Sequence, residues 1–178
     1  AKKILVLPSN TIDEEKEFGI KFAEALMRFD LTWIIKKDSE ITDDDIVNNS
    51  LLILGRKEIN LLTSKLMDSN LISNVKLAPA SFSINEKIYD KNTTSLLFSM
   101  RNPKNNDKTI TFYMGNCLEA MEKSPGEGTK WFMPFPVEML SNLFGGRPAE
   151  SFSAEEIRRI REIFQKMDSN GKEGNPKG

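Results

Sequence analysis

Apolar runs and amphipathic stretches alternate along the first third of the chain. Ile4–Leu7 and Leu51–Leu54 are continuously apolar, which is typical of strands buried on both faces of a parallel sheet. The β-rich segment Leu31–Ile35 lies between them. Thr11 and Glu14 form a capping-box pattern, and apolar residues then recur at helical spacing up to residue 29. This succession of strands and helix predicts an α/β fold.

Two shorter helices are predicted on either side of the second apolar run. Thr42 is followed by three aspartates, which we interpret as the first turn of a helix rather than a cation site, because the helix dipole favours acidic residues there. Gly55 ends the apolar run, and Ile59, Leu62 and Leu66 then mark the inner face of a further helix.

Antiparallel pairs are predicted in the next part of the chain. Asn85–Glu86 separates two short strand patterns and predicts a hairpin. Ser95–Met100 and Thr109–Met114 are joined by a polar loop too short to hold a crossover helix, so these strands are expected to be antiparallel. Cys117–Lys123 has the pattern of one or two helical turns. The predicted fold class is α/β with three layers. Its mostly parallel sheet carries an antiparallel edge hairpin in a Rossmann-like or flavodoxin-like arrangement, followed by a C-terminal helical extension.

A stretch rich in glycine and proline, Ser124–Thr129, marks the predicted end of the α/β domain. We expect residues 1–123 to form this domain. Residues 124–167 are expected to form a helical extension that packs on the domain, and residues 168–178 a flexible tail.

The segment 131–144 is unusually rich in aromatic and other apolar residues. We expect it to fold back and cover one face of the sheet, because an uncovered sheet face is unstable. The alternative is a partner-binding surface, or a contact between copies of the chain in a homo-oligomer, formed by Trp131, Phe132 and Phe135.

Composition removes several classes of function. The net charge of −1 over 178 residues gives no overall field that would attract nucleic acid. No segment approaches the roughly 20 consecutive apolar residues of a transmembrane helix. The chain has no histidine, which excludes Ser-His-Asp and Cys-His catalysis and histidine-ligated zinc. Its single cysteine, Cys117, cannot form an internal disulfide.

Polar residues follow the predicted parallel strands at the edge where such sheets bind ligands. They offer hydroxyls, amides, the two cations Arg56 and Lys57, and helix N-termini, a set suited to a small anion. Each also has a structural explanation as a helix cap or a strand terminator, and no dinucleotide-binding glycine pattern is present. The candidate ligand-binding residues are Ser9, Asn10, Thr11, Gly55, Arg56 and Asn116.

Two other patterns are better explained by structure than by chemistry. Cys117 could be a nucleophile at a helix start, but without histidine it lacks the usual base, so a small, partly buried thiol is expected. Pro125–Lys130 does not have the spacing of a phosphate-binding loop and is interpreted as a linker. The sequence therefore predicts no catalytic residue, no metal site and no cofactor.

Three short stretches carry a family resemblance: a strand ending in glycine within Leu51–Asn60, an Asn-Pro loop that ends Ser95–Pro103 after Lys87–Asp90, and a strand ending in Gly-Asn at Thr109–Asn116. They resemble the non-catalytic α/β module that accompanies some bacterial secreted peptidases and esterases of the α/β-hydrolase or metallopeptidase kind. The resemblance implies that catalysis belongs to a neighbouring domain, and it transfers no catalytic residue to this chain.

We therefore expect a non-catalytic accessory or interaction domain of a larger bacterial, extracytoplasmic protein, periplasmic or secreted. Its expected partner is a neighbouring domain or protein rather than nucleic acid or a membrane. The alternative is a small anionic ligand-binding domain, or an enzyme, that uses the crevice at the strand ends.

Overall fold

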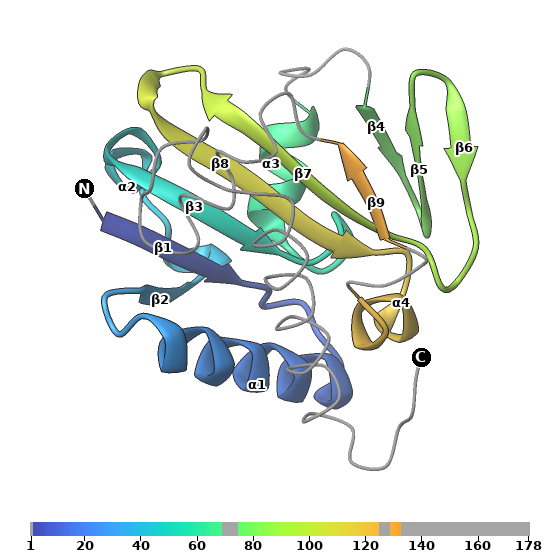
Figure 1. Cartoon of the computed structure of the whole chain (residues 1–178), viewed down its shortest axis with the longest axis horizontal. Coiled ribbons are helices and arrows are strands. Elements are labelled where there is room, and N and C mark those ends of the chain that lie inside the picture. The colour runs from blue at the N-terminus through green and yellow to red at the C-terminus, as the bar shows by residue number, and fades with distance from the viewer. Residues whose placement is uncertain (1, 69–74, 125–128, 133–178) are drawn as a thin grey trace, which may run out of the picture.

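Two β-sheets and four α-helices form the part of the chain that the computed structural model describes, residues 2–68, 75–124 and 129–132 (Figure 1). The elements are, in chain order, β1 (Lys2–Leu7), α1 (Asp13–Phe29), β2 (Ile34–Lys37), the 3₁₀ helix η1 (Asp38–Glu40), α2 (Asp43–Asn48), β3 (Asn49–Leu54), α3 (Leu61–Asp68), β4 (Val75–Ala78), β5 (Ser81–Ile84), β6 (Lys87–Tyr89), β7 (Ser95–Asn102), β8 (Asn105–Gly115), α4 (Leu118–Glu122) and β9 (Thr129–Phe132). The main sheet has the order β2-β1-β3-β8-β7-β9, and a separate small sheet has the order β4-β5-β6.

Parallel pairing dominates the main sheet, as predicted. β1 pairs with β2 and β3, and β3 pairs with β8, all in parallel. The continuous apolar runs of β1 and β3 are buried, because packed residues cover both faces of these strands. β2 begins at Ile34, later than the predicted Leu31, because the backbone N–H of Thr32 donates a hydrogen bond of 2.9 Å to Asp30 and forms a turn there.

The hairpin of β7 and β8 is antiparallel, as predicted, but it does not lie at the edge of the sheet. β8 is an inner strand beside β3, and β9 pairs in parallel with the outer side of β7. The sheet therefore continues past the boundary expected at residue 124, and residues 129–132 form a strand where the helical extension was expected. The rest of that extension, Phe135 included, and the tail at 168–178 lie outside the described residues.

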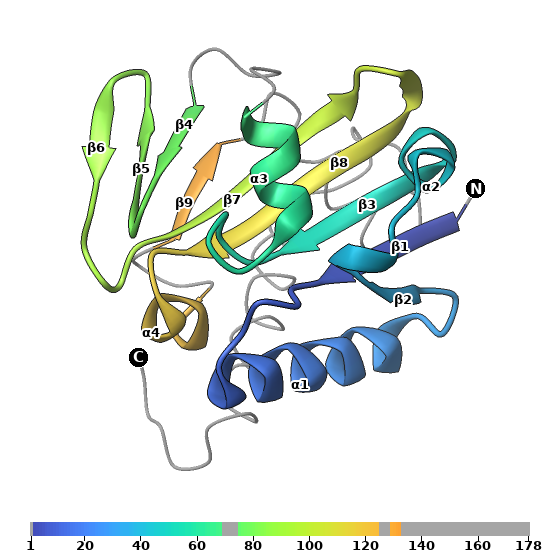
Figure 2. The same ribbon diagram turned by 180° about the vertical axis from the view of Figure 1, so that it is seen from behind.

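Helices cover both faces of the main sheet, as comparison of Figures 1 and 2 shows. Apolar residues of α1 and α4 pack on one face, where Leu26 and Met121 join Leu5, Leu52 and Leu97. On the opposite face, residues of α2, α3 and the small sheet surround the other side chains of β1, β3, β7 and β8. Side chains alternate between the two faces along each strand, so each central strand contributes to both clusters.

The capping box of α1 is shifted by one residue from the predicted pair of Thr11 and Glu14. The backbone N–H of Ile12 donates to Oε1 of Glu15 at 3.1 Å. Glu15 lies on the buried side of α1, whereas Glu14 is exposed. The side chain of Glu15 is therefore held where it can accept the hydrogen bond from the backbone N–H of Ile12 at the start of the helix.

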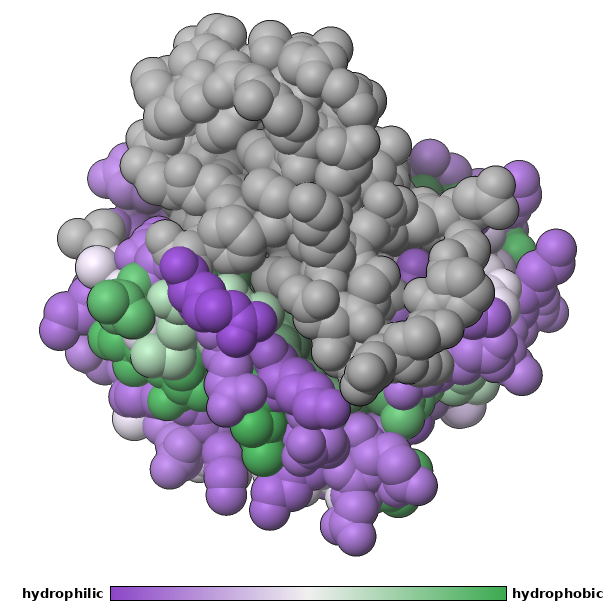
Figure 3. Space-filling model, turned by 60° about the horizontal axis from the view of Figure 1, so that its bottom comes forward, coloured by the Kyte–Doolittle hydropathy of each residue, from purple (hydrophilic) through white to green (hydrophobic). Residues whose placement is uncertain are grey.

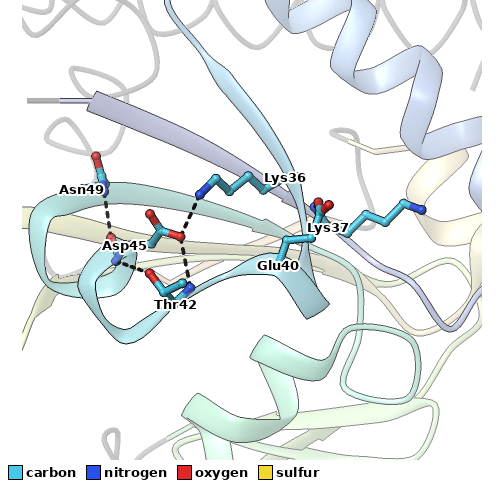
Figure 4. Close-up of polar contacts among 6 residues, drawn as sticks. All are labelled: Lys36, Lys37, Glu40, Thr42, Asp45 and Asn49. Carbon is cyan, nitrogen blue, oxygen red and sulfur yellow. Dashed lines mark hydrogen bonds and ion pairs between the residues drawn. The ribbon is translucent and has the colours of Figure 1, made fainter.

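The capping of α2 also joins this helix to β2 (Figure 4). Oγ1 of Thr42 accepts from the N–H of Asp45 at 3.1 Å, and the Asp45 carboxylate accepts from the N–H of Thr42 and from Nζ of Lys36 at 2.9 Å. Hydrogen bonding by Thr42, followed by the contact with Lys36, lowers the pKa of Asp45. The acidic first turn is thus a helix cap, as predicted.

The turn before β2 makes acid stability sensitive to one carboxylate. Lys3 and Thr32 both donate hydrogen bonds to the Asp30 carboxylate, and these bonds lower the pKa of Asp30 from 3.8 to about 2. Nζ of Lys3 also lies 5.1 Å from the centre of the Trp33 ring. A lowered folded-state pKa stabilises the fold above pH 4 and loses this effect as the pH falls towards 2. We expect Asp30→Asn to lower the free energy of unfolding at neutral pH by about 1 to 2 kcal/mol, discounted for partial exposure.

The difference between Asp30→Asn and wild type should shrink towards zero between pH 4 and 2, as measured by urea unfolding. Asp107→Asn, at an exposed position near the start of β8, is the matched control and should leave the profile unchanged. A difference that stays constant over this pH range would contradict the assignment.

The exposed surface near α1 is mainly hydrophilic, and its apolar residues form small, separate groups (Figure 3). Among the described residues, the large apolar side chains that are exposed are Ile12, Ile20, Leu31, Leu61 and Ile88. No helix in the described ranges is both long and apolar enough to cross a bilayer.

Candidate functional site

The carboxyl ends of β1, β3 and β8 lie at one edge of the main sheet, because these strands are parallel. After β1 the chain enters α1 on one face, and after β3 it enters α3 on the other face (Figures 1 and 2). Loops that diverge in this way form the crevice where doubly wound sheets bind ligands. The predicted residues Ser9, Asn10, Gly55, Arg56 and Asn116 all lie at this edge.

Hydrogen bonds close the crevice between the β1 and β3 loops. The backbone N–H of Asn10 donates to the carbonyl of Ile59 at 3.1 Å, and Nδ2 of Asn10 donates to the carbonyl of Glu58 at 2.9 Å. The amide that was expected to meet a ligand therefore binds the neighbouring loop.

Asn60, which the sequence analysis did not single out, lies fully buried beneath this closure. Its Nδ2 donates to the carbonyls of Leu54 at 2.8 Å and Val6 at 3.3 Å, which joins the ends of β3 and β1. Its Oδ1 accepts from the N–H groups of Leu62 at 2.9 Å and Thr63 at 3.3 Å, which caps α3. The available signal was an asparagine directly before a helical pattern.

Asp38, the first residue of η1, follows β2 directly and also joins loops at this edge. Its Oδ2 accepts from the N–H of Leu61 at 2.7 Å and from the N–H of Ser9 at 3.3 Å. Its buried Oδ1 meets no hydrogen-bond donor among the described residues. The Ser9 backbone is therefore part of the internal network as well.

Arg56 lies between two carboxylates. Its guanidinium is 2.9 Å from Oε2 of Glu15 on α1 and 3.7 Å from Oε2 of Glu58. Glu58 in turn accepts from the N–H of Ala80, in the turn between β4 and β5, at 2.9 Å. The predicted anion-binding cation is thus already neutralised, and its partner Glu58 holds the small sheet to the main one.

Gly55 ends β3 in a conformation that favours glycine, with φ of 111°. A Cβ atom at this position would approach Cδ1 of Ile59 to 3.0 Å. The N–H of Gly55 donates to Tyr113, and its carbonyl accepts from Oγ1 of Thr63 at 2.9 Å. This fits the structural explanation of Gly55 as a strand terminator.

Asn116 fixes the loop that follows β6. Its Nδ2 donates to the carbonyls of Lys91 at 2.9 Å and Tyr89 at 3.1 Å. The next residue, Cys117, precedes α4 and donates its thiol hydrogen to the carbonyl of Asn92 at 3.0 Å. Cys117, rather than Asn116, is therefore the N-cap residue of α4, and the side chain of Asn116 instead binds the backbone of a distant loop.

Two hollows flank the loop that follows β3. One, of about 300 Å³ including space open to solvent, lies beside α1 and α4 and is lined mainly by apolar residues such as Phe18, Ile59 and Met121. The other, of about 210 Å³, lies beside the β4–β5 turn and is lined by Arg56, Lys57 and Asn116 among others. Ligand pockets span about 300 to 1,000 Å³ and enclose most of their ligand. Both hollows are therefore at or below the lower limit.

The remaining predicted residues are less informative about this edge. Thr11 is half-buried and lines neither of the two hollows. Trp131 and Phe132 belong to β9, where they pair with Leu97 and Phe98.

In the described ranges, no group of three or more acidic or cysteine side chains is placed to hold a metal ion. Comparison with known protein families, with curated proteins and with solved structures found no match to this chain.

Proposed function

We propose that this chain is a non-catalytic interaction module of a larger, extracytoplasmic bacterial protein, and that it acts by packing against a neighbouring domain or protein. The observation that carries the proposal is the closure of the strand-end crevice. Asn10, Asn60 and Asp38 bind neighbouring loops there, and Arg56 is neutralised by Glu15 and Glu58. A crevice filled by internal bonds has little chemistry left for a substrate.

The same proposal includes a Rossmann-like classification of the main sheet. The order β2-β1-β3-β8 and the helices on both faces support it. The resemblance of residues 51–116 to accessory modules of secreted peptidases and esterases supports the accessory role, because in such proteins a separate domain carries the catalytic residues.

The second candidate function is binding of a small anion in the hollow beside the β4–β5 turn. Two cationic side chains, Arg56 and Lys57, and the amide of Asn116 line this hollow. However, both cations already have carboxylate neighbours. Arg56 lies 2.9 Å from Glu15, and Lys57 lies 3.7 Å from Asp68. An anion would have to compete with these carboxylates.

Hydrogen exchange can test both candidates in one series. Amide exchange of the 178-residue chain is compared with exchange of the same residues in the complete natural polypeptide. If the chain is an interaction module, a contiguous set of surface amides should exchange at least about tenfold more slowly in the complete polypeptide. Identical exchange in both, or a natural polypeptide with no further domain, would contradict the primary proposal.

A parallel sample receives about 10 mM inorganic phosphate. Under the primary proposal, the amides of Lys57, Glu58 and Asn116 should exchange at the same rate with and without phosphate. Protection of these amides that is lost in Lys57→Gln would favour the anion-binding function instead. Protection retained in Lys57→Gln would indicate a general effect of salt and leave the primary proposal intact.

A further inference from the structure

β6 is the outer strand of the small sheet and lies at the margin of the molecule in both views (Figures 1 and 2). Asn85 and Glu86 have φ of 51° and 72°, which is the geometry of a two-residue type I′ hairpin. In such a hairpin the flanking residues, Ile84 and Lys87, form a hydrogen-bonded pair, and so do Phe82 and Tyr89. The N–H and C=O groups of Ile88 therefore point outward, to the edge of β6 that pairs with no strand of the described residues.

The two faces of this edge differ in chemistry. Ile88 is 68% exposed on the outer face, in a row with Ser83 and Lys76. Lys87 and Tyr89 alternate with Ile88, and they lie on the face that packs toward the main sheet. A strand added to β6 would thus meet an apolar contact on one face and a cation on the other.

Two lysines converge on the Tyr89 ring. Nζ of Lys87 lies 5.4 Å and Nζ of Lys130 lies 5.5 Å from the ring centre, and stacking on Phe82 at 5.3 Å fixes the ring. Neither lysine forms an ion pair with any residue of the described ranges, unlike Lys3, Lys36 and Lys57, each of which has a carboxylate partner.

Lysines outnumber acidic residues around β6, although the whole chain has a net charge of −1. The lysines on and beside the small sheet are Lys76, Lys87, Lys91 and Lys130, and the acidic residues are Glu58, Glu86 and Asp90. This local excess favours an acidic partner.

A second copy of the chain fits this edge poorly. Antiparallel self-pairing that uses the outward groups has three registers, centred on Lys87, Ile88 or Tyr89. The first sets Lys87 opposite its own copy, the second sets Glu86 opposite Asp90, and the third sets Lys87 opposite Lys91. Like charges directly opposite each other destabilise a strand pair.

We infer that the free edge of β6 binds an extended acidic segment of a partner protein, which adds as a fourth strand to the small sheet. Acidic residues at alternate positions of the segment face Lys87 and Lys130, and apolar residues between them contact Ile88. Backbone hydrogen bonds to Ile88 hold the segment, and the alternating side chains select it. This inference rests on the proposed interaction function and names the partner chemistry.

The probe is an acetylated, amidated peptide of sequence GEVEVEG, titrated into the full chain by calorimetry at physiological salt. We expect binding that slows amide exchange at Ile88 and that weakens at least about tenfold in the double variant Lys87→Glu, Lys130→Glu. The matched control combines Lys104→Glu in the β7–β8 turn with Lys108→Glu in β8. It changes the net charge equally and should bind within about twofold of wild type.

Two N-methylated peptides separate strand addition from simple charge attraction. One carries methyl groups on the valine nitrogens and the other on the glutamate nitrogens, and each therefore blocks one edge of the peptide strand. Strand addition predicts that one isomer binds like the parent peptide and that the other loses at least about tenfold in affinity. Equal affinities of the two isomers would overturn the inference.

The inference also fails if the peptide shows no binding, or if the chain is a dimer that Ile88→Pro dissociates. Both results concern β6 alone and leave the proposed function to its own test, the exchange comparison with the complete polypeptide. Conversely, phosphate protection lost in Lys57→Gln would count against the proposed function without changing the peptide result.

Discussion

Asn60→Ala is expected to lower the free energy of unfolding by about 3 kcal/mol or more. The side chain is fully buried and binds the carbonyls of Val6 and Leu54 and the N–H groups of Leu62 and Thr63. Alanine would leave these four backbone groups without their partner, in a place that water does not reach. Each such unsatisfied group costs about 1 to 3 kcal/mol before relaxation.

Urea unfolding, monitored by circular dichroism, measures this loss of stability. Asn48→Ala is the control, because Asn48 is exposed on α2 and its side chain makes one hydrogen bond, to Asp44. It should change stability by less than about 0.5 kcal/mol. A change below about 1 kcal/mol for Asn60→Ala would show that the strand ends do not depend on this side chain.

Two glycines should respond to alanine with opposite signs. A Cβ atom on Gly115 would lie 2.8 Å from Cβ of Ala120 and 3.0 Å from the carbonyl oxygen of Cys117, so β8 or α4 must move. We expect Gly115→Ala to destabilise the fold by about 2 to 3 kcal/mol. Gly19, within α1, has its nearest contact at an ordinary 3.6 Å, from Leu7. Gly19→Ala should stabilise the fold by about 0.5 to 1 kcal/mol.

Thermal unfolding of the two variants side by side checks the pair. The midpoint should fall for Gly115→Ala and rise for Gly19→Ala. A fall for both would point to an unfavourable effect of alanine that is unrelated to the close approach of α4 to β8. Equal midpoints would contradict the steric argument for Gly115.

Local sequence patterns were sufficient to predict the central parallel strands β1 and β3. Ile4–Val6 and Leu51–Leu54 are buried in strands covered on both faces, and a run of that kind is apolar at every position. The hairpin at Asn85–Glu86 was also predicted, because its turn is formed by adjacent residues. In contrast, Thr129–Phe132 is a strand because it pairs with β7, and a four-residue segment carries no periodicity that could reveal this.

The sequence placed the candidate residues at one edge of the sheet, but it did not show that their side chains are already bound to other residues of the chain. The strand-end rule placed Asn10, Gly55 and Arg56 at one edge, and they lie there. Whether Arg56 is available to a ligand depends on Glu15, which is distant in the sequence and reaches it because the first turn of α1 lies at the carboxyl ends of the strands. Pairings between such distant residues arise from tertiary packing, so single-sequence reasoning cannot recover them.

The late position of β9 in the chain has a consequence for synthesis on the ribosome. Until residues 129–132 have emerged, the outer side of β7 has no strand to pair with, although its segment Leu96–Phe98 is strongly apolar. A nascent chain, or a shortened gene product that stops at residue 123, would expose this apolar edge to other chains. Pairing with β9 thus sets the point in translation after which the apolar β7 is no longer an edge strand.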